Sequence, residues 1–472
     1  MMKYLAIAAI VLSVVSCKTP STAERQSNLK LPEQYSTSSD TVNTAKEKWS
    51  AYFSDTNLKT LIETALANNQ ELNIAMQEIE IARNEVKTRK GEYLPFVGLR
   101  GGAGVDKVGR YTSKGANDAT TEIKPGVETP EPLQDYMVGA YATWEVDVWG
   151  KLRNAKKSAI SRYLASVEGR NFMVTNLISE IADSYYELIA LDNQLEIVNQ
   201  NIAIQNNAFE VVKLQKEAAR VNELAVRRFQ AQVLDTKSLQ FNILQKITET
   251  ENRINFLVGR FPQHVDRDAS TFFAFNPKEV HIGIPAQLLE NRPDIKQAEL
   301  ELQATKFDVK SAKARFYPSL GISAGVGFQA FKPSYLFTTP ESLLYNVVGD
   351  LAAPLLNRNA IKASFNTANA KQIQAVYEYE KVLLNAYVEV SNLQNKIENS
   401  RKAFELKAQQ VEAMNQSVTI ANDLFKSTRA DYMEVLLTQR DALESKFDLV
   451  ETKMQQINAM IAVYRALGGG WK

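Results

Sequence analysis

The amino-acid sequence of 472 residues predicts a mixed fold, in which strands of a membrane β-barrel are joined to a long α-helical coiled-coil barrel and each chain holds two tandem repeats. Three observations predict this fold. The two halves of the chain resemble each other, and each half contains a heptad pattern that runs unbroken for about 65 residues. Each half also contains strands that alternate between apolar residues and small or polar residues.

The duplication becomes visible when the second half of the chain is laid on the first. "LANNQELNIAMQEIEIARNEV" from Leu66 aligns without gaps with "LENRPDIKQAELELQATKFDV" from Leu289. The shift is roughly 223 residues and falls to roughly 209 further along, which is far longer than the period of a solenoid repeat. Each copy reads as helix, strand, loop, strand, very long helix and returning helix. In the second copy, Pro293 and Asp294 of "NRPD" suit the first turn of a helix and predict no more than a helix start.

The helices are predicted from apolar residues that recur in steps of three and four. In the first helix this seam consists of Leu58, Ile62, Ala65, Leu72, Met76, Ile79 and Val86, with polar Asn69 and Arg83 filling two further positions. The same seam continues through both long stretches, and a helix of that length is on the order of 100 Å long. Such a seam alone would favour a fibrous or dimeric coiled coil, and the strands are what argue against that alternative.

The strands are long and have one apolar face. "VGAYATWEVDV" from Val138 and "SLGISAGVGFQ" from Ser319 alternate with period two, as expected for outer-membrane strands. Two hairpins supply four strands, and an open sheet edge in lipid would leave unpaired backbone groups. Two copies would close an eight-stranded barrel filled by side chains, whereas three copies would close a twelve-stranded barrel with a lumen. We therefore expect a homotrimer.

The N-terminus predicts export and lipidation. Lys3 precedes an apolar run of about a dozen residues, too short to cross a bilayer and suited to a secretory signal. The run ends at Ser16-Cys17, which resembles a bacterial lipobox, and Cys17 is the only cysteine in the sequence. An ordinary signal peptide cut near Ser16 is the alternative. The boundaries we predict are a signal peptide at 1–16, a lipid-anchored extended segment at 17–55, the first repeat at 56–260, a connector at 261–286, the second repeat at 287–468 and a C-terminal tail at 469–472.

Composition excludes several other classes of function. With 55 basic and 54 acidic residues the chain lacks the basic excess of a nucleic-acid-binding protein. His264 and His281 have no cluster of metal-type ligands around them, so we expect no metal site and no cofactor. Glu145 and Asp147 form an acid pair that could suggest a hydrolase, but alternation places both on the face predicted to line the lumen. We therefore expect that the protein is not an enzyme.

The sequence resembles the TolC-like outer-membrane efflux channels, in particular the lipoprotein (NodT-type) branch that works with RND-type pumps. The resemblance covers nearly the whole chain after the signal peptide. It rests on the lipobox at Cys17, "YLP" from Tyr93, "WEVDVWGKLR" from Trp144, "LLENRPD" from Leu288, "RFYPSLGISAGVGF" from Arg315 and "YRALGGGW" from Tyr464. It implies a homotrimer in the outer membrane of a Gram-negative-type bacterium, anchored by lipid and extending into the periplasm. It also implies a periplasmic adaptor and an inner-membrane pump as partners.

The resemblance further implies that the adaptor meets the two turns where the long helices reverse. These turns, "AARVNE" and "STRADY", carry alanine and threonine where the family usually has glycine, which leaves their geometry open. Solvated helix ends without a docking role are the alternative. The residues implied in docking are Ala219, Arg220, Val221, Asn222, Thr428, Arg429, Ala430 and Asp431.

A gate just after the second turn is the last expectation from the resemblance. Family members place two acids there, and this chain has Glu434 and Leu437 at those positions, so we expect a ring that is partly acidic and partly apolar. Phe425 could add a hydrophobic plug. In the alternative, Glu434 lies on the outer helix surface and pairs with Arg440 or with a neighbouring chain.

The function that these expectations favour is a passive outer-membrane conduit of a tripartite efflux system. The competing class is a periplasmic coiled-coil spacer or the adaptor itself. An adaptor would carry one helical hairpin flanked by small β-domains, and the duplicated strand-and-helix unit argues against it.

We predict that Cys17 is the acylated N-terminus of the mature protein. Mass spectrometry of the N-terminal peptide should detect acyl chains on Cys17. An unmodified cysteine, or cleavage at another bond, would contradict the prediction. If Cys17→Ser still folds into the barrel, the lipid is an anchor only and is not part of the pore.

Overall fold

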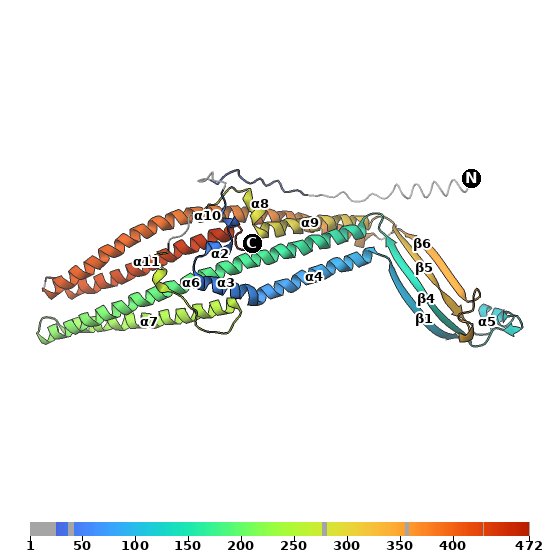
Figure 1. Cartoon of the computed structure of the whole chain (residues 1–472), viewed down its shortest axis with the longest axis horizontal. Helices are drawn as coiled ribbons and strands as arrows, with labels where there is room; N and C mark the ends of the chain where they lie inside the picture. The colour runs from blue at the N-terminus through green and yellow to red at the C-terminus, as the bar shows by residue number, and fades with distance from the viewer. Residues whose placement is uncertain (1–24, 36–41, 276–280, 355–357, 428, 472) are drawn as a thin grey trace. The chain divides into compact units, whose positions relative to one another are not determined.

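A computed structural model describes residues 25–35, 42–275, 281–354, 358–427 and 429–471 (Figure 1). The predicted signal peptide and Cys17 lie outside these residues. The chain divides into two compact units. The sheet unit contains Glu80–Leu164 and Leu300–Tyr377, and the helical unit contains Asn28–Ile79, Ala165–Glu299 and Glu378–Lys472. Both halves of the sequence contribute to both units.

The elements follow the same order in the two halves of the chain. The first half contains α3 (Thr56–Asn68), α4 (Gln70–Tyr93), β1 (Phe96–Asp106), β4 (Leu133–Val146), α6 (Lys151–Glu217) and α7 (Glu223–Val258). The second half contains α8 (Gln287–Asn291), α9 (Pro293–Ala314), β5 (Ser319–Ala330), β6 (Leu343–Ala352), α10 (Asn359–Lys426) and α11 (Tyr432–Ala466). The shorter elements are η1 (Thr44–Lys46), α2 (Trp49–Tyr52), α5 (Ser113–Asp118), β2 (Glu122–Lys124), β3 (Val127–Glu128), η2 (Ala269–Thr271) and η3 (Pro333–Tyr335).

The two long helices agree with the heptad pattern. Helix α6 has 67 residues and helix α10 has 68, so each rises about 100 Å along its axis. Seam residues of α6 such as Ile181, Leu188 and Val198 are almost completely buried. They join the largest core cluster of the helical unit, to which α3, α7 and α11 also contribute. No helix in the described part of the chain combines the length and the apolar character needed to span a membrane.

The first predicted helix is interrupted, which the seam did not indicate. The backbone of Asn69 leaves the helical region (φ −62, ψ 127) and separates α3 from α4. Its buried side chain accepts a hydrogen bond from the Leu72 backbone N–H at 3.0 Å, so it caps α4, and donates to the Leu257 carbonyl at 2.8 Å. An asparagine at a helix start offers the backbone an alternative partner, and here that competition breaks the helix. Met76, predicted in the seam, is 45 % exposed.

The second repeat has an equivalent break with a different side chain. Arg292 separates α8 from α9, which begins at Pro293 as "NRPD" predicts. The Arg292 side chain is only 8 % exposed. It donates to the Ala466 carbonyl at 2.7 Å, to Glu389 at 2.8 Å and, with two further nitrogens, to Asp294 at 2.7 and 3.0 Å. Ala466 corresponds to Leu257 in the repeat, so each break is tied to the end of its returning helix.

Glycines allow these ends to approach closely. Gly259 (φ 77) and Gly468 (φ 86) follow α7 and α11 in the left-handed region. A Cβ atom on Gly259 would lie 2.6 Å from the Asn68 carbonyl oxygen, and one on Gly468 would lie 2.5 Å from that of Asn291. Since any larger residue would clash with backbone here, glycine is required at both positions.

The sheet unit contains one four-stranded antiparallel sheet in the order β1-β4-β5-β6 (Figure 1). Its register places Gly98, Tyr141, Gly325 and Asn346 in one row across the four strands. Strands β1 and β6 form the two edges, and each is paired on one side only within the described residues. Strands β2 and β3 form a separate hairpin in the long loop between β1 and β4.

We predict that Arg292→Ala lowers the free energy of unfolding by about 3 kcal/mol, because it removes the guanidinium from Asp294 and from the buried Ala466 carbonyl and leaves Glu389 with Arg465 alone. Denaturant unfolding of the purified protein, followed by helical circular dichroism, measures the change. The matched control is Arg401→Ala, since Arg401 bonds Glu398 and Glu405 on the surface and is 50 % exposed. Equal stabilities of the two variants would contradict the structural role of Arg292.

Candidate functional site

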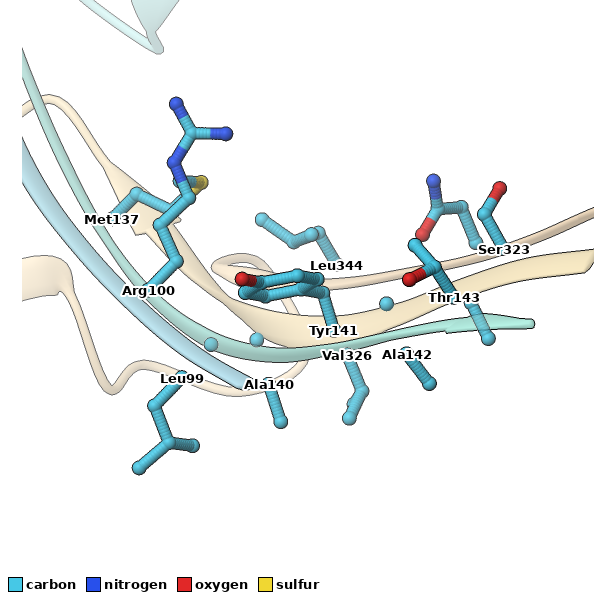
Figure 2. A pocket seen from close by; sticks show the side chains of 15 residues that line it. Leu99, Arg100, Met137, Ala140, Tyr141, Ala142, Thr143, Ser323, Val326 and Leu344 are labelled. Atoms are coloured by element: carbon cyan, nitrogen blue, oxygen red, sulfur yellow. The ribbon is translucent and has the colours of Figure 1, made fainter. Parts of the chain in front are cut away.

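The two faces of the four-stranded sheet differ in chemistry. Figure 2 shows Leu99 and Val326 on one side of the sheet and Arg100, Tyr141 and Ser323 on the other. The register extends the apolar side over all four strands, where it includes Val97, Val138, Ala140, Ala142, Trp144, Ile322, Ala324, Phe328, Tyr345, Val347 and Leu351. Because large apolar surfaces on proteins mark contacts with lipid or with other proteins, this face is suited to lipid.

The exposed fractions show how little of this apolar face is covered within one chain. Leu99 is 86 % exposed, Tyr345 and Val347 are each 78 % exposed, and Leu351 is 68 % exposed. The register places all four residues on the apolar face, in agreement with the predicted alternation. A face of this kind would be unfavourable in water.

The opposite face carries a hollow of about 610 Å³ (Figure 2). The side chains that rise around it include Arg100, Met137, Tyr141 and Leu344 (Figure 2), and Asn346 also lines it. Between them the strands carry glycine. Sequence analysis placed polar and small residues on this face but did not single out the hollow.

The two turns of the long helices also share a cavity, of about 520 Å³. It brings together residues of both predicted docking segments with residues of α6, α10 and α11. The cavity is lined by Gln215, Ala219, Arg220, Val221, Asn222, Phe425, Ala430, Asp431 and Tyr432. Arg429 is exposed and is not part of this lining, and Thr428 lies outside the described residues.

The first turn keeps a left-handed residue although glycine is absent. Ala219 has φ 58 and is the only non-glycine residue with positive φ among those described. The Ala219 N–H donates to the Lys216 carbonyl at 2.9 Å, and the Arg220 N–H donates to that of Gln215 at 2.8 Å. These two bonds form a Schellman motif, which alanine adopts at a cost of about 1 kcal/mol. Asn222 then caps α7 through a 3.1 Å bond from the Ala225 N–H.

Charged side chains reinforce the first turn on its surface. Glu223 accepts hydrogen bonds from Lys216 and, at 2.8 Å, from Arg227. The bond from Lys216 lowers the pKa of the Glu223 carboxyl. The carboxyl therefore remains charged when the solution is mildly acidic.

The second turn begins with a similar backbone bond, from the Arg429 N–H to the Leu424 carbonyl at 2.8 Å. Asp431 occupies the N-cap of α11 with extended backbone, but its side chain makes no capping bond. Its carbonyl accepts the Glu434 N–H at 3.1 Å. The Asp431 carboxylate is exposed and remains available to a ligand or partner.

A hydrophobic cluster lies beneath both turns, and Phe425 belongs to it. The cluster joins Val212 of α6 and Phe229 of α7 to Phe425 of α10 and Val435 of α11. Phe425 is only 9 % exposed. The structure thus places Phe425 in the packing that joins the two helix pairs, where it is not a free plug.

Glu434 and Leu437 are both exposed on α11, and the Leu437 exposure is 41 %. They lie three residues apart and therefore share one side of the helix. The suggested pairing of Glu434 with Arg440 is not formed, because Arg440 bonds its neighbour Asp441 at 2.9 Å. Both side chains remain on open surface in one protomer.

The acid pair at the end of β4 has structural roles. The Glu145 carboxylate pairs with Lys151. The Asp147 side chain is only 2 % exposed and accepts the N–H groups of Leu152 and Arg153 at 3.0 and 2.8 Å, so it caps α6. The expectation that Asp147 lies on the polar sheet face is wrong, because β4 ends at Val146. Within the described residues no group of three His, Cys, Asp or Glu could hold a metal ion.

Comparison with known proteins identifies the family to which this chain belongs. The family model described as outer membrane efflux protein matches residues 61–260 and 284–469. The pyoverdine export outer membrane protein OpmQ of Pseudomonas aeruginosa is 26% identical over 476 residues, covering 100% of this chain and 98% of the relative. The cation efflux system protein CusC of Escherichia coli is 24% identical, covering 98% of each. The probable outer membrane lipoprotein SilC of Salmonella typhimurium is 24% identical, covering 100% of this chain and 99% of the relative.

Solved structures show the same fold. A membrane protein from Pseudomonas aeruginosa superimposes with a TM-score of 0.84 at 20% identity, covering 95% of this chain and 99% of that chain. The open state of the MtrE outer membrane channel of Neisseria gonorrhoeae gives a TM-score of 0.82 at 21% identity, with coverages of 96% and 98%. The chain therefore belongs to the outer membrane efflux protein family, and it is an outer-membrane efflux channel of the TolC-like type.

Proposed function

We propose that three copies of this chain close a twelve-stranded barrel in the outer membrane and continue it as a helical barrel. The observation that carries this proposal is the four-stranded sheet, which has an apolar face and two edge strands, β1 and β6. Unpaired backbone groups at these edges would each cost several kcal/mol in lipid. Pairing β1 of one copy with β6 of the next removes both edges, and three sheets give twelve strands.

The channel acts as a passive conduit with no chemistry of its own, and its partners are a periplasmic adaptor and an inner-membrane RND-type pump. Family membership over nearly the whole chain argues against the spacer and adaptor alternatives. The cavity at the two helix turns supports the docking role, because it gathers residues from both turns. Cys17 carries the lipid that anchors the N-terminus beside the barrel.

We predict that the adaptor docks at the turns. Cysteine at Asn222 or Asp431, both exposed, should form disulfide crosslinks with cysteines at the tip of the adaptor hairpin. Cys17 is the only native cysteine in the sequence, and its lipidated sulfur cannot form a disulfide. The matched control is cysteine at Lys114, which is 62 % exposed in the sheet unit and should not crosslink. Crosslinks at Lys114 alone would rule out docking at the turns.

We predict a gate at Glu434 and Leu437. Threefold symmetry would repeat each side chain around one axis, so Glu434→Ala should lower the cation preference severalfold and Leu437→Ser should raise the resting conductance. Single-channel recording in planar bilayers measures both. Glu444→Ala removes an exposed carboxylate elsewhere on α11 and should change neither. If the first two variants conduct like the wild type, the gate lies elsewhere.

A further inference from the structure

We propose that the hollow on the polar sheet face binds small planar aromatic carboxylates, with Arg100 holding the carboxylate and Tyr141 lying beside the ring. This inference rests on the proposed function, because the polar face lines a lumen only when three sheets close. It assigns a class of ligand to the barrel and proposes that this ligand binds there during passage. A passive conduit does not require such binding. The reasoning starts from the register of the four strands.

The floor of the hollow is a row of the sheet that carries two adjacent glycines. In this row Arg100 of β1 lies opposite Gly139 of β4, followed by Gly327 of β5 and Leu344 of β6. A Cβ on Gly139 would lie 2.8 Å from the Val326 carbonyl oxygen, and one on Gly327 would lie 2.5 Å from that of Val138. The two strands therefore leave a bare backbone surface, on which a flat ring can lie.

The neighbouring row provides one wall of the hollow. The Tyr141 ring extends over Gly98, where a Cβ would lie 2.8 Å from the ring carbon Cζ. Asn346 extends over Gly325 in the same row, with its Oδ1 2.6 Å from the position of a Cβ. Both side chains thus lie on glycines of their own row and leave the Gly139 row open. Figure 2 shows Tyr141 rising on the same side of the sheet as Arg100.

The two ends of the floor have opposite character. Arg100 supplies a guanidinium at one end, and Leu344 supplies an apolar side chain at the other. Met137 rises from β4 on the far side of the floor from Tyr141 (Figure 2). A ring on the glycine floor would thus have Tyr141 and Met137 on its two sides. Its carboxylate would point toward Arg100, which can bind it through two parallel N–H donors.

The Arg100 charge is not neutralised within one chain. Arg100 is exposed and makes no hydrogen bond or ion pair with any residue that the structure describes. Among the described acids of this face, Asp106, Asp135 and Glu145 already have partners, and Asp350 lies on β6, at the sheet edge opposite to β1. Asp135 accepts two 2.9 Å bonds from Gln329, and Glu145 pairs with Lys151. Arg100 is therefore the positive group of the hollow, and three copies would form a positive belt around the lumen.

This arrangement favours an aromatic acid over other solutes. A neutral ring gains the contacts with Tyr141 and the floor but no charge interaction. A small aliphatic anion meets Arg100 but leaves the apolar side of the hollow in water. The combination of guanidinium, aromatic wall and bare floor is best matched by a flat ring that bears one carboxylate.

Planar-bilayer recording of the purified full-length channel tests the proposal with three probes at equal concentration. Benzoate carries both features, acetate carries only the charge, and benzamide carries only the ring. We expect benzoate to reduce the single-channel conductance of the wild type, and acetate and benzamide to leave it nearly unchanged. Arg100→Gln should abolish the benzoate effect and shift the permeability ratio severalfold toward cations, because it removes one positive charge from each of the three copies.

Matched variants separate the two contacts. Tyr141→Ala should weaken the benzoate effect and keep the ion preference of the wild type, whereas Tyr141→Phe should retain both. Arg110→Gln removes a loop arginine that is 64 % exposed and should change neither property. If Arg100→Gln fails to assemble, the response of the wild type to the three probes still decides, and Arg100→Lys should keep the ion preference.

Failure of the binding proposal and failure of the proposed function give different results. A wild-type channel that conducts but treats benzoate like acetate overturns the binding proposal and leaves the conduit intact. A persistent benzoate effect in Arg100→Gln also overturns it. A folded protein that forms no conducting trimer overturns the proposed function instead.

Discussion

The ties from Asn69 and Arg292 to the ends of the returning helices are the interactions on which the helical unit depends. Each closes its repeat, because the side chain at the break in the first helix bonds a carbonyl at the end of the last one. The adjacent glycines, Gly259 and Gly468, allow the backbones to approach closely there. Long helices expose apolar seams along their whole length, and these closures hold the seams together in one packed unit.

The two repeats solve the same problem with different chemistry. Asn69 uses a neutral amide that also caps the next helix, whereas Arg292 joins two carboxylates in a network with little solvent contact. A buried charge needs several partners, so the second junction tolerates less change than the first. The repeats also differ between their strands, where the first half inserts α5 and the β2–β3 hairpin. Duplication thus preserved the order of elements while the junctions and loops diverged.

The chemistry of the sheet relates the fold to export through a membrane. One face is apolar on all four strands, and the other carries polar groups and glycine. This division suits a wall between lipid and water, and we propose that closure by three copies completes it. We also propose that the cavity at the helix turns serves as the docking surface for a partner. A passive conduit needs both features and no catalytic group.

The sequence determined the elements that depend on local periodicity. The duplication, the long helices and the two-faced strands could be predicted because spacing along one chain decides which side chains share a face. Several features depended on contacts between distant segments and were missed. The heptad spacing continues across Asn69, and the structure shows that this side chain both caps α4 and bonds the distant Leu257 carbonyl. Phe425 was predicted as a plug, but its burial depends on α6 and α7 packing against it.

The roles of Arg292 and of the hollow at Arg100 were missed in the sequence for the same reason: both depend on contacts between distant residues. In the sequence Arg292 belongs to a plain helix start, and its partners Glu389 and Ala466 lie 97 and 174 residues away. Arg100 and Tyr141 gain their common site only from the register, which pairs Arg100 with Gly139, two residues before Tyr141 on β4. Periodicity specifies which residues share a face of one element, and tertiary packing decides which faces meet. Side-chain sites formed by distant residues are therefore set by the tertiary structure.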